Sequence, residues 1–171
     1  MEHLGACGAR ALIVTGSIGA GKTTAALQFA ELWRASNRTV GGVASPRVLD
    51  QGETVGYKVR DLRSGQEMQF CSAQPPGIPF RRFFFSPQGL AFANEVLTRD
   101  AQGLDVVVID EVGPLELAGG GLCPGVHQVL SGNSPLLVTV RPSLLRDFHI
   151  WAGLTGKTVV VSLDRPEETG A

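Results

Sequence analysis

The chain has 171 residues, 15 Lys and Arg nearly balance 16 Asp and Glu, and 43% of the residues are hydrophobic. This length predicts one domain, which would bury about 70% of its unfolded surface and needs neither a disulfide nor a metal to fold. A net charge of −1 lacks the long-range attraction that nucleic acid or an anionic membrane requires. We therefore expect no stable nucleic-acid binding and no membrane binding.

Cysteine usage and the N-terminus indicate the compartment. The three cysteines are widely spaced without a Cys-x-x-Cys pair, which argues against a zinc site or a disulfide framework and suits reducing conditions. No basic region followed by a long apolar stretch opens the chain, so no secretory signal is expected. Residues 117–140 carry no Lys, Arg, Asp or Glu, but glycines and prolines interrupt them too often for a spanning helix. We expect a cytoplasmic protein, and a monomer.

The first half of the chain begins with an α/β pattern and then changes. Residues 11–15 are a short apolar run that predicts a buried strand, and residues 22–35 repeat apolar side chains at helical spacing. Residues 40–45 predict a second strand. An alternating segment, a turn and a further short segment then predict an antiparallel hairpin inserted at about residues 46–72. Three prolines make residues 74–79 a surface loop.

The second half returns to alternating strands and helices. Residues 105–110, Asp-Val-Val-Val-Ile-Asp, are the clearest strand, typical of a central parallel strand covered on both faces. Residues 164–171 are expected to be a loose tail of a single domain that spans residues 1–171. The remaining predicted elements are a strand at 82–85, a helix at 88–99, a short helix at 124–130, a strand at 135–140, a helix at 143–150 and a strand at 158–163.

A phosphate-binding motif lies between the first strand and the first helix. Residues 16–23, Gly-Ser-Ile-Gly-Ala-Gly-Lys-Thr, fit G-x-x-x-x-G-K-[ST], whose backbone N–H groups and helix N-terminus hold phosphate oxygens. Lys22 would reach the β- and γ-phosphates, and the Thr23 hydroxyl would bind Mg²⁺. The nucleotide-binding residues expected here are Gly16, Ser17, Ile18, Gly19, Ala20, Gly21, Lys22, Thr23 and Thr24.

A second Gly-Lys-Thr triplet, residues 156–158, lacks this context. Trp151 stands where the motif needs its first glycine, and the triplet leads into a strand instead of a helix. It predicts only a connection between elements.

An acidic pair lies at the carboxyl end of the valine-rich strand, where α/β proteins place their functional sites. Asp110 is expected to hold Mg²⁺ or its water, and Glu111 can accept a proton from a water aimed at the γ-phosphate. The same segment also allows the N–H of Gly113 to touch the γ-phosphate, and the sequence leaves the strand order open. We favour Glu111 as the base, with Asp110 and Lys22 completing the catalytic set.

At these motifs the chain resembles the small cancer-related nucleoside-triphosphatases, a family also described as nucleotide kinases. The similarity covers residues 16–24, 41–46 with 52–57, and above all 107–117, Val-Val-Ile-Asp-Glu-Val-Gly-Pro-Leu-Glu-Leu. The chain differs from many relatives at Leu49, where they have Arg, and matches only loosely around residues 163–165.

The resemblance implies a fold and an activity. It implies a P-loop, RecA-like α/β three-layer sandwich with a mostly parallel sheet, here with the inserted hairpin. It also implies slow, Mg²⁺-dependent hydrolysis of ATP, GTP and other nucleoside triphosphates, and it marks Glu116 as a motif acid of unassigned role.

Two further functions remain open from the sequence. A kinase would pass the γ-phosphate to a nucleotide or other small acceptor and needs a lid with arginines, which the chargeless residues 118–125 do not supply. A nucleotide-dependent switch or scaffold would hydrolyse only incidentally. Arginines that could neutralise transition-state charge are Arg141, favoured because it ends a strand, and Arg47, Arg60, Arg63, Arg146 and Arg165.

Overall fold

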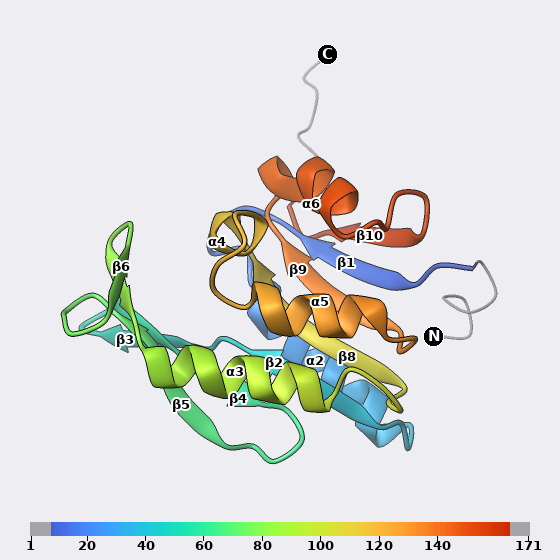
Figure 1. Ribbon diagram of the computed structural model, residues 1–171, viewed down its shortest axis with the longest axis horizontal. Helices are drawn as coiled ribbons and strands as arrows, with labels where there is room; N and C mark the ends of the chain where they lie inside the picture. The colour runs from blue at the N-terminus through green and yellow to red at the C-terminus, as the bar shows by residue number, and fades with distance from the viewer. Residues whose placement is uncertain (1–7, 165–171) are drawn as a thin grey trace.

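The structure is a computed structural model that describes residues 8–164. Ten strands within these residues form one mixed sheet in the order β10-β1-β9-β8-β2-β4-β5-β7-β6, with β3 paired to β4 (Figure 1). The strands are β1 (Ala11–Thr15), β2 (Val40–Ala44), β3 (Arg47–Asp50), β4 (Glu53–Asp61), β5 (Glu67–Ser72), β6 (Ile78–Phe80), β7 (Phe83–Phe85), β8 (Val106–Val112), β9 (Leu136–Val140) and β10 (Thr158–Ser162).

Helices cover both faces of the sheet. Helix α2 packs on one face, against β1, β2, β8 and β9, while α3 and α5 pack side by side on the other (Figure 1). Within residues 8–164, no helix combines the length and hydropathy that crossing a membrane requires. The helices are α2 (Lys22–Ala35), α3 (Pro87–Arg99), α4 (Pro114–Leu117), α5 (Cys123–Ser131), the 3₁₀ helix η1 (Pro142–Leu144) and α6 (Leu145–Trp151).

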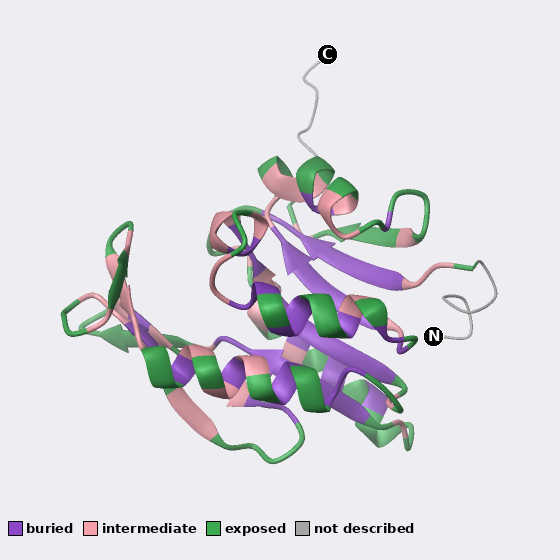
Figure 2. Cartoon of the chain, viewed as in Figure 1, coloured by how far each residue is buried: buried purple, intermediate pink, exposed green. Residues whose placement is uncertain are grey.

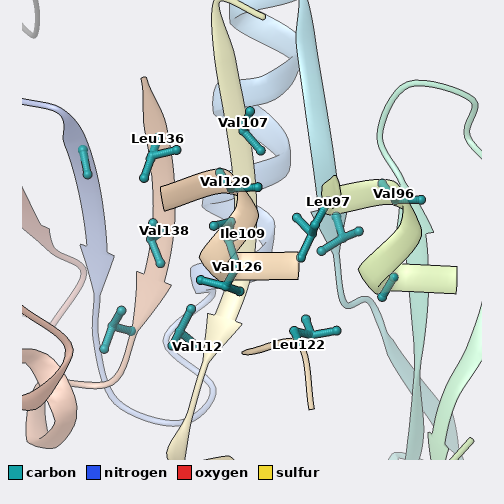
Figure 3. Packing of buried hydrophobic residues seen from close by; sticks show 14 of the residues in the cluster. Val96, Leu97, Val107, Ile109, Val112, Leu122, Val126, Val129, Leu136 and Val138 are labelled. Atoms are coloured by element: carbon teal, nitrogen blue, oxygen red, sulfur yellow. The ribbon is translucent and has the colours of Figure 1, made fainter. Parts of the chain in front are cut away.

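The predicted fold class, a mostly parallel α/β sandwich, is confirmed. Strands β10, β1, β9, β8 and β2 are all parallel, and the central ones are buried on both sides (Figure 2). Along β1, Ile13 joins the core cluster beneath α3 and α5, and its neighbour Leu12 joins the cluster beneath α2. Figure 3 shows the first cluster, in which Ile109 and Val138 of the sheet pack with the helices. Because β9 separates β1 from β8, the phosphate loop and the acidic strand end face each other across one strand.

The inserted hairpin is the centre of a larger antiparallel extension. Strands β4 and β5 pair as predicted, and β3, β7 and β6 enlarge the same sheet. The predicted loop over 74–79 is wrong at its end, because Ile78 and Pro79 belong to β6. Pro79 is tolerated there since β6 is the last strand of the sheet, where a missing backbone donor does least harm.

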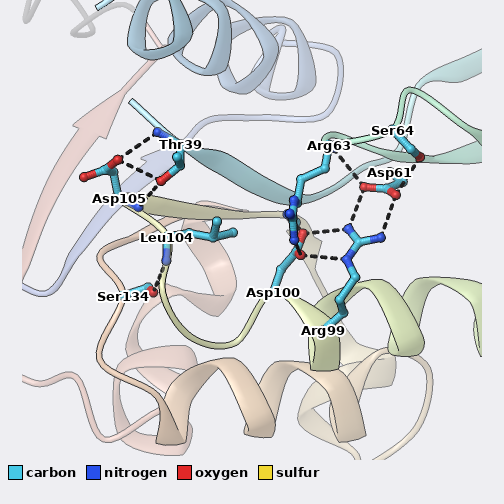
Figure 4. Close-up of polar contacts among 10 residues, drawn as sticks. Thr39, Asp61, Arg63, Ser64, Arg99, Asp100, Leu104, Asp105 and Ser134 are labelled. Atoms are coloured by element: carbon cyan, nitrogen blue, oxygen red, sulfur yellow. Dashed lines mark hydrogen bonds and ion pairs between the residues drawn. The ribbon is translucent and has the colours of Figure 1, made fainter. Parts of the chain in front are cut away.

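An ionic network ties this extension to the parallel half (Figure 4). Arg99, at the end of α3, donates two hydrogen bonds to Asp61 of β4, at 2.9 and 3.0 Å, and also pairs with Asp100. Asp100 accepts the backbone N–H of Gly42 at 2.8 Å and pairs with Arg63. Burial raises the pKa of Asp61, but hydrogen bonds from Arg99 and other donors outweigh it and hold the pKa well below its usual range.

Replacing Arg99 tests this network. The side chain of Arg99 is 44% exposed, whereas those of Asp61 and Asp100 are buried, so Arg99→Ala leaves two buried carboxylates short of a partner. We expect a loss of about 2–3 kcal/mol in unfolding free energy, below the range for fully buried pairs because Arg99 is partly hydrated. Urea unfolding measures it, with exposed Arg146→Ala as the matched control.

The pH dependence gives a second readout of the same variant. A carboxyl whose folded pKa is depressed stabilises the protein above its unfolded pKa, about 4, and loses that contribution as the pH falls through the folded value. The unfolding free energy of the wild type should therefore fall steeply as the pH is lowered below about 4. That of Arg99→Ala should fall less steeply over the same pH range. Equal slopes in the two proteins would contradict the role given to Arg99.

Candidate active site

The phosphate loop joins β1 to α2, as the motif predicts. Gly21 has a φ of 90°, a left-handed conformation that favours glycine, directly before the first residue of α2. The Lys22 ammonium donates hydrogen bonds to the carbonyls of Gly16 and Ser17, at 2.7 and 2.8 Å, and so lies over the loop. Burial lowers the pKa of Lys22, and the charge of Arg141 lowers it further while Glu111 opposes this shift.

Asp164, distant in sequence, is hydrogen-bonded to the phosphate loop. Its carboxylate accepts the backbone N–H of Ser17 at 2.9 Å and the Ser17 hydroxyl at the same distance. Asp164 is the first residue of the predicted tail over 164–171. The other residues of that tail, including the candidate Arg165, lie outside the described part of the chain.

A β-bulge shapes the acidic end of β8. Ile109 pairs with Val138 and Val112 with Val140, so that Asp110 and Glu111 together face Thr139 of β9. Glu111 has a φ of 65°, which a residue with a side chain rarely adopts. The bulge allows both neighbouring acids to serve one site, because it interrupts the strict alternation of the strand.

Thr139 holds the two acids in place. Its hydroxyl donates to Asp110 at 2.8 Å and accepts the backbone N–H of Glu111 at 2.7 Å. Thr139 is fully buried. The only sequence signal for it is a hydroxyl within an apolar run, and no motif in the sequence includes it.

Asp110 is a buried carboxylate on the central strand β8. Its side chain forms no ion pair with any residue from 8 to 164, and it accepts the backbone N–H of Ser45 at 2.9 Å. Burial raises the pKa of Asp110, and hydrogen bonds from Ser45, Thr139 and Thr23 oppose the rise. The Ser45 hydroxyl beside it is buried and finds no hydrogen-bond partner among the described residues, so a cation with bound water would satisfy both groups.

Glu111 pairs with Arg141, the arginine favoured from the sequence. The guanidinium of Arg141 donates to one carboxylate oxygen of Glu111, and the two side chains are 27% and 35% exposed. Both residues therefore remain accessible from the cavity that they line.

Gly113 and Glu116 form a structural unit. The buried Glu116 carboxylate accepts the N–H of Gly113 at 2.9 Å and that of Leu122 at 3.2 Å, closing the short helix α4 against the start of α5. Burial raises the pKa of Glu116. Because the Gly113 N–H is already bonded, this geometry favours Glu111 over Gly113 as the group that acts at the γ-phosphate.

Two adjoining cavities meet at Glu111 and Arg141. A cavity of about 360 Å³, the nucleotide cavity, is lined by the phosphate loop with Pro46, Arg47 and Tyr57. A second, of about 440 Å³, the aromatic cavity, extends from Glu111 and Arg141 toward the β6–β7 hairpin. Ile18, Ser45 and Tyr57 also line both.

The other candidate arginines of the described residues differ in whether they line a cavity. Arg47 lines the nucleotide cavity. Arg60 pairs with Glu67 and Arg63 with Asp100, away from both cavities, and Arg146 is exposed. The structure thus brings Arg141 and Arg47 to the site.

A phosphate loop after β1, facing an acidic strand end across β9, defines a P-loop α/β nucleotide-binding protein. The model of the NTPase family matches residues 11–165, and the chain belongs to this family. The nucleoside-triphosphatase THEP1 of Thermofilum pendens is 35% identical over 136 residues, which cover 78% of this chain and 74% of that protein.

Solved structures show the same fold. A human cancer-related nucleoside triphosphatase is 25% identical, with a TM-score of 0.68 over 94% of this chain and 90% of its own. THEP1 from Aquifex aeolicus is 22% identical, with a TM-score of 0.70 over 93% and 92% of the two chains, and supports the fold alone.

Proposed function

We propose that this protein hydrolyses nucleoside triphosphates, ATP and GTP among them, to the diphosphate and phosphate, with Mg²⁺ as cofactor. The observation that carries the proposal is that the phosphate loop and the accessible Glu111 line one cavity, while the buried Asp110 carboxylate is hydrogen-bonded to Ser45 in the wall of that cavity and forms no ion pair within residues 8–164. The relatives named above are nucleoside-triphosphatases, and their names support the activity.

The residues present suit Mg²⁺. Thr23 supplies a hydroxyl and Asp110 a carboxylate, and Mg²⁺ prefers oxygen ligands while it keeps several waters. The Ser45 hydroxyl, which has no hydrogen-bond partner within residues 8–164, could hold one such water. When bound, the ion would draw charge from the phosphate oxygens as the bond to the γ-phosphate breaks.

The chain's own groups supply the remaining chemistry. The loop N–H groups hold the β-phosphate, and Lys22 leaves the loop carbonyls to contact the γ-phosphate oxygens. Glu111 accepts the proton of the attacking water, and Arg141 positions its carboxylate through their ion pair. Arg141 also lies where it can offset charge that develops on the phosphate.

Phosphate release from a panel of triphosphates, with Mg²⁺ present, tests the function. Among residues 8–164, Glu111 is the one acidic side chain that lines the nucleotide cavity, and no amide side chain lines it. We therefore expect little selection of the base, and release from ATP and GTP at similar rates would support a broad hydrolase. No release from any triphosphate would contradict the proposal.

Metal dependence gives a separate prediction. EDTA should stop hydrolysis, and added Mg²⁺ should restore it. Asp110→Asn keeps the shape and one acceptor oxygen for Ser45 or Thr139 but removes the charge, so we expect a higher Mg²⁺ requirement and at least about a ten-fold slower rate. Asp147→Asn, at an exposed site on α6, is the control. Undiminished turnover in EDTA would exclude the metal role.

A further inference from the structure

The aromatic cavity is not accounted for by triphosphate hydrolysis. Its volume of about 440 Å³ lies within the range of small-molecule sites, and water as the attacking group needs no such space. Its walls include Tyr57, Phe70, Phe80, Phe83, Phe85 and Leu115.

The rings of this cavity are arranged as a binding surface more than as core. Tyr57, Phe80, Phe83 and Phe85 are only half-buried, whereas Phe70 beneath them is buried. Phe83 meets Tyr57 edge to face, with ring centroids 5.6 Å apart, and Phe85 meets Phe70 in the same way at 5.2 Å. Half-exposed, mutually braced rings around a hollow favour a flat aromatic ligand, which stacks on such surfaces.

Two arginines mark the outer end of the cavity. Arg81 and Arg82 form the two-residue tip between β6 and β7, and the hairpin stands at one end of the molecule (Figure 1). Their guanidinium groups lie over the rings of Phe80 and Phe83, at 5.6 and 4.8 Å from the centroids. Within residues 8–164 neither forms an ion pair, so both charges are free to bind an anion.

The inner end of the cavity reaches the reacting groups. Glu111 and Arg141 line both cavities, so a ligand that fills the aromatic cavity lies next to the γ-phosphate. Glu116, the other acid in the wall, is occupied by two backbone N–H groups. Glu111 is therefore the group in this wall that can take a proton from the ligand.

We propose that the aromatic cavity binds a planar aromatic molecule bearing an anionic group and a hydroxyl, and that this hydroxyl accepts the γ-phosphoryl group. The inference rests on the proposed function, because the triphosphate is the donor. The rings hold the flat part of the acceptor, Arg81 and Arg82 hold its anion, and the hydroxyl lies at Glu111.

The transfer balances with these groups. A bond forms between the acceptor oxygen and the γ-phosphorus, and the bond from that phosphorus to the bridging oxygen breaks. The hydroxyl proton passes to Glu111, and the nucleoside diphosphate leaves with the electron pair on its terminal oxygen. Without an acceptor, water takes the same place, which is the hydrolysis proposed above.

The experiment follows label from GTP carrying a radioactive γ-phosphate, with Mg²⁺. The probes are hydroxymethyl-naphthoate and adenosine monophosphate, which both combine flat rings, an anion and a hydroxyl. Naphthoate, which lacks the hydroxyl, should bind without being labelled, and hydroxymethyl-naphthalene, which lacks the charge, should bind more weakly. We expect label on the hydroxyl of at least one probe.

Variants of residues that line the aromatic cavity test whether the labelled probe is bound there. Phe83→Ala and Arg82→Ala should each lower the ratio of transferred to released phosphate about ten-fold, the effect of one lost stacking or charged contact. Phe83→Leu, which keeps apolar volume without the ring, guards against a folding defect, and Arg146→Ala is the control. Calorimetry measures probe binding in each protein.

The outcomes separate the two proposals. Label found only in inorganic phosphate, or transfer that ignores Phe83 and Arg82, overturns the acceptor site while hydrolysis without probe still stands. Probe binding without transfer also overturns the acceptor role. Absence of hydrolysis without any probe, by contrast, contradicts the proposed function itself.

Discussion

Glu111→Gln should slow triphosphate hydrolysis by about 10²–10⁴-fold, the usual contribution of a positioned general base. Glutamine keeps the size of the side chain and an oxygen that can accept from Arg141, but it cannot take the proton from water. Triphosphate affinity should change little, because the loop, Lys22 and Thr23 are untouched. A stable complex with intact triphosphate is expected, and equilibrium binding together with single-turnover release measures both quantities.

The control for this variant is Glu95→Gln, at an exposed position on α3. It makes the same chemical change away from the cavities and should leave the rate at the wild-type value. If Glu111→Gln hydrolyses within about three-fold of wild type, well below the range for a general base, Glu111 is not the base. A switch-like protein with incidental hydrolysis would then be the better description.

Lys22→Ala should reduce turnover by at least about 10²–10³-fold, the effect of removing one donor that stabilises charge in a transition state. The Lys22 ammonium donates hydrogen bonds to loop carbonyls, and Lys22 belongs to neither core cluster of the described residues, so the fold should survive. Circular dichroism checks the fold, and phosphate release measures the rate.

The second Gly-Lys-Thr triplet provides a matched control. Lys157 has the same neighbours in sequence but precedes the edge strand β10, and it lines neither cavity. Lys157→Ala should therefore hydrolyse at the wild-type rate. A native Lys22→Ala protein that is equally active would show that the phosphate loop has been assigned wrongly.

What the sequence could predict here depends on how local each feature is. The phosphate loop and the pair Asp110-Glu111 are contiguous motifs next to a clearly predicted strand. Their identity and their position at the carboxyl ends of the strands could therefore be predicted from the sequence. The parallel sheet was predicted because strands alternate with helices along the chain, and its central strand because residues 105–110 are rich in β-branched residues. Their order depends on pairing between distant segments, and only the structure shows β9 between β1 and β8.

The missing parts of the site are those that depend on such pairing. Thr139 of β9 and Ser45, directly after β2, contact Asp110 from the two strands that flank β8, and the bulge at Glu111 is a register shift that no residue pattern marks. The sequence did not indicate that Arg81 and Arg82 line a cavity, because they follow β6, a three-residue edge strand containing proline. Short edge strands bury little and so leave a weak periodic signal.

The left-handed backbone conformation at Glu111 lowers the stability of the fold at the same residue that is proposed to act as the base. Glycine or asparagine would adopt this conformation more readily than glutamate, whose side chain makes it cost of order 1 kcal/mol. A search for more stable variants would thus favour residues that cannot act as a base here. Persistence of glutamate at this position among natural variants of the chain would record selection for chemistry over folding.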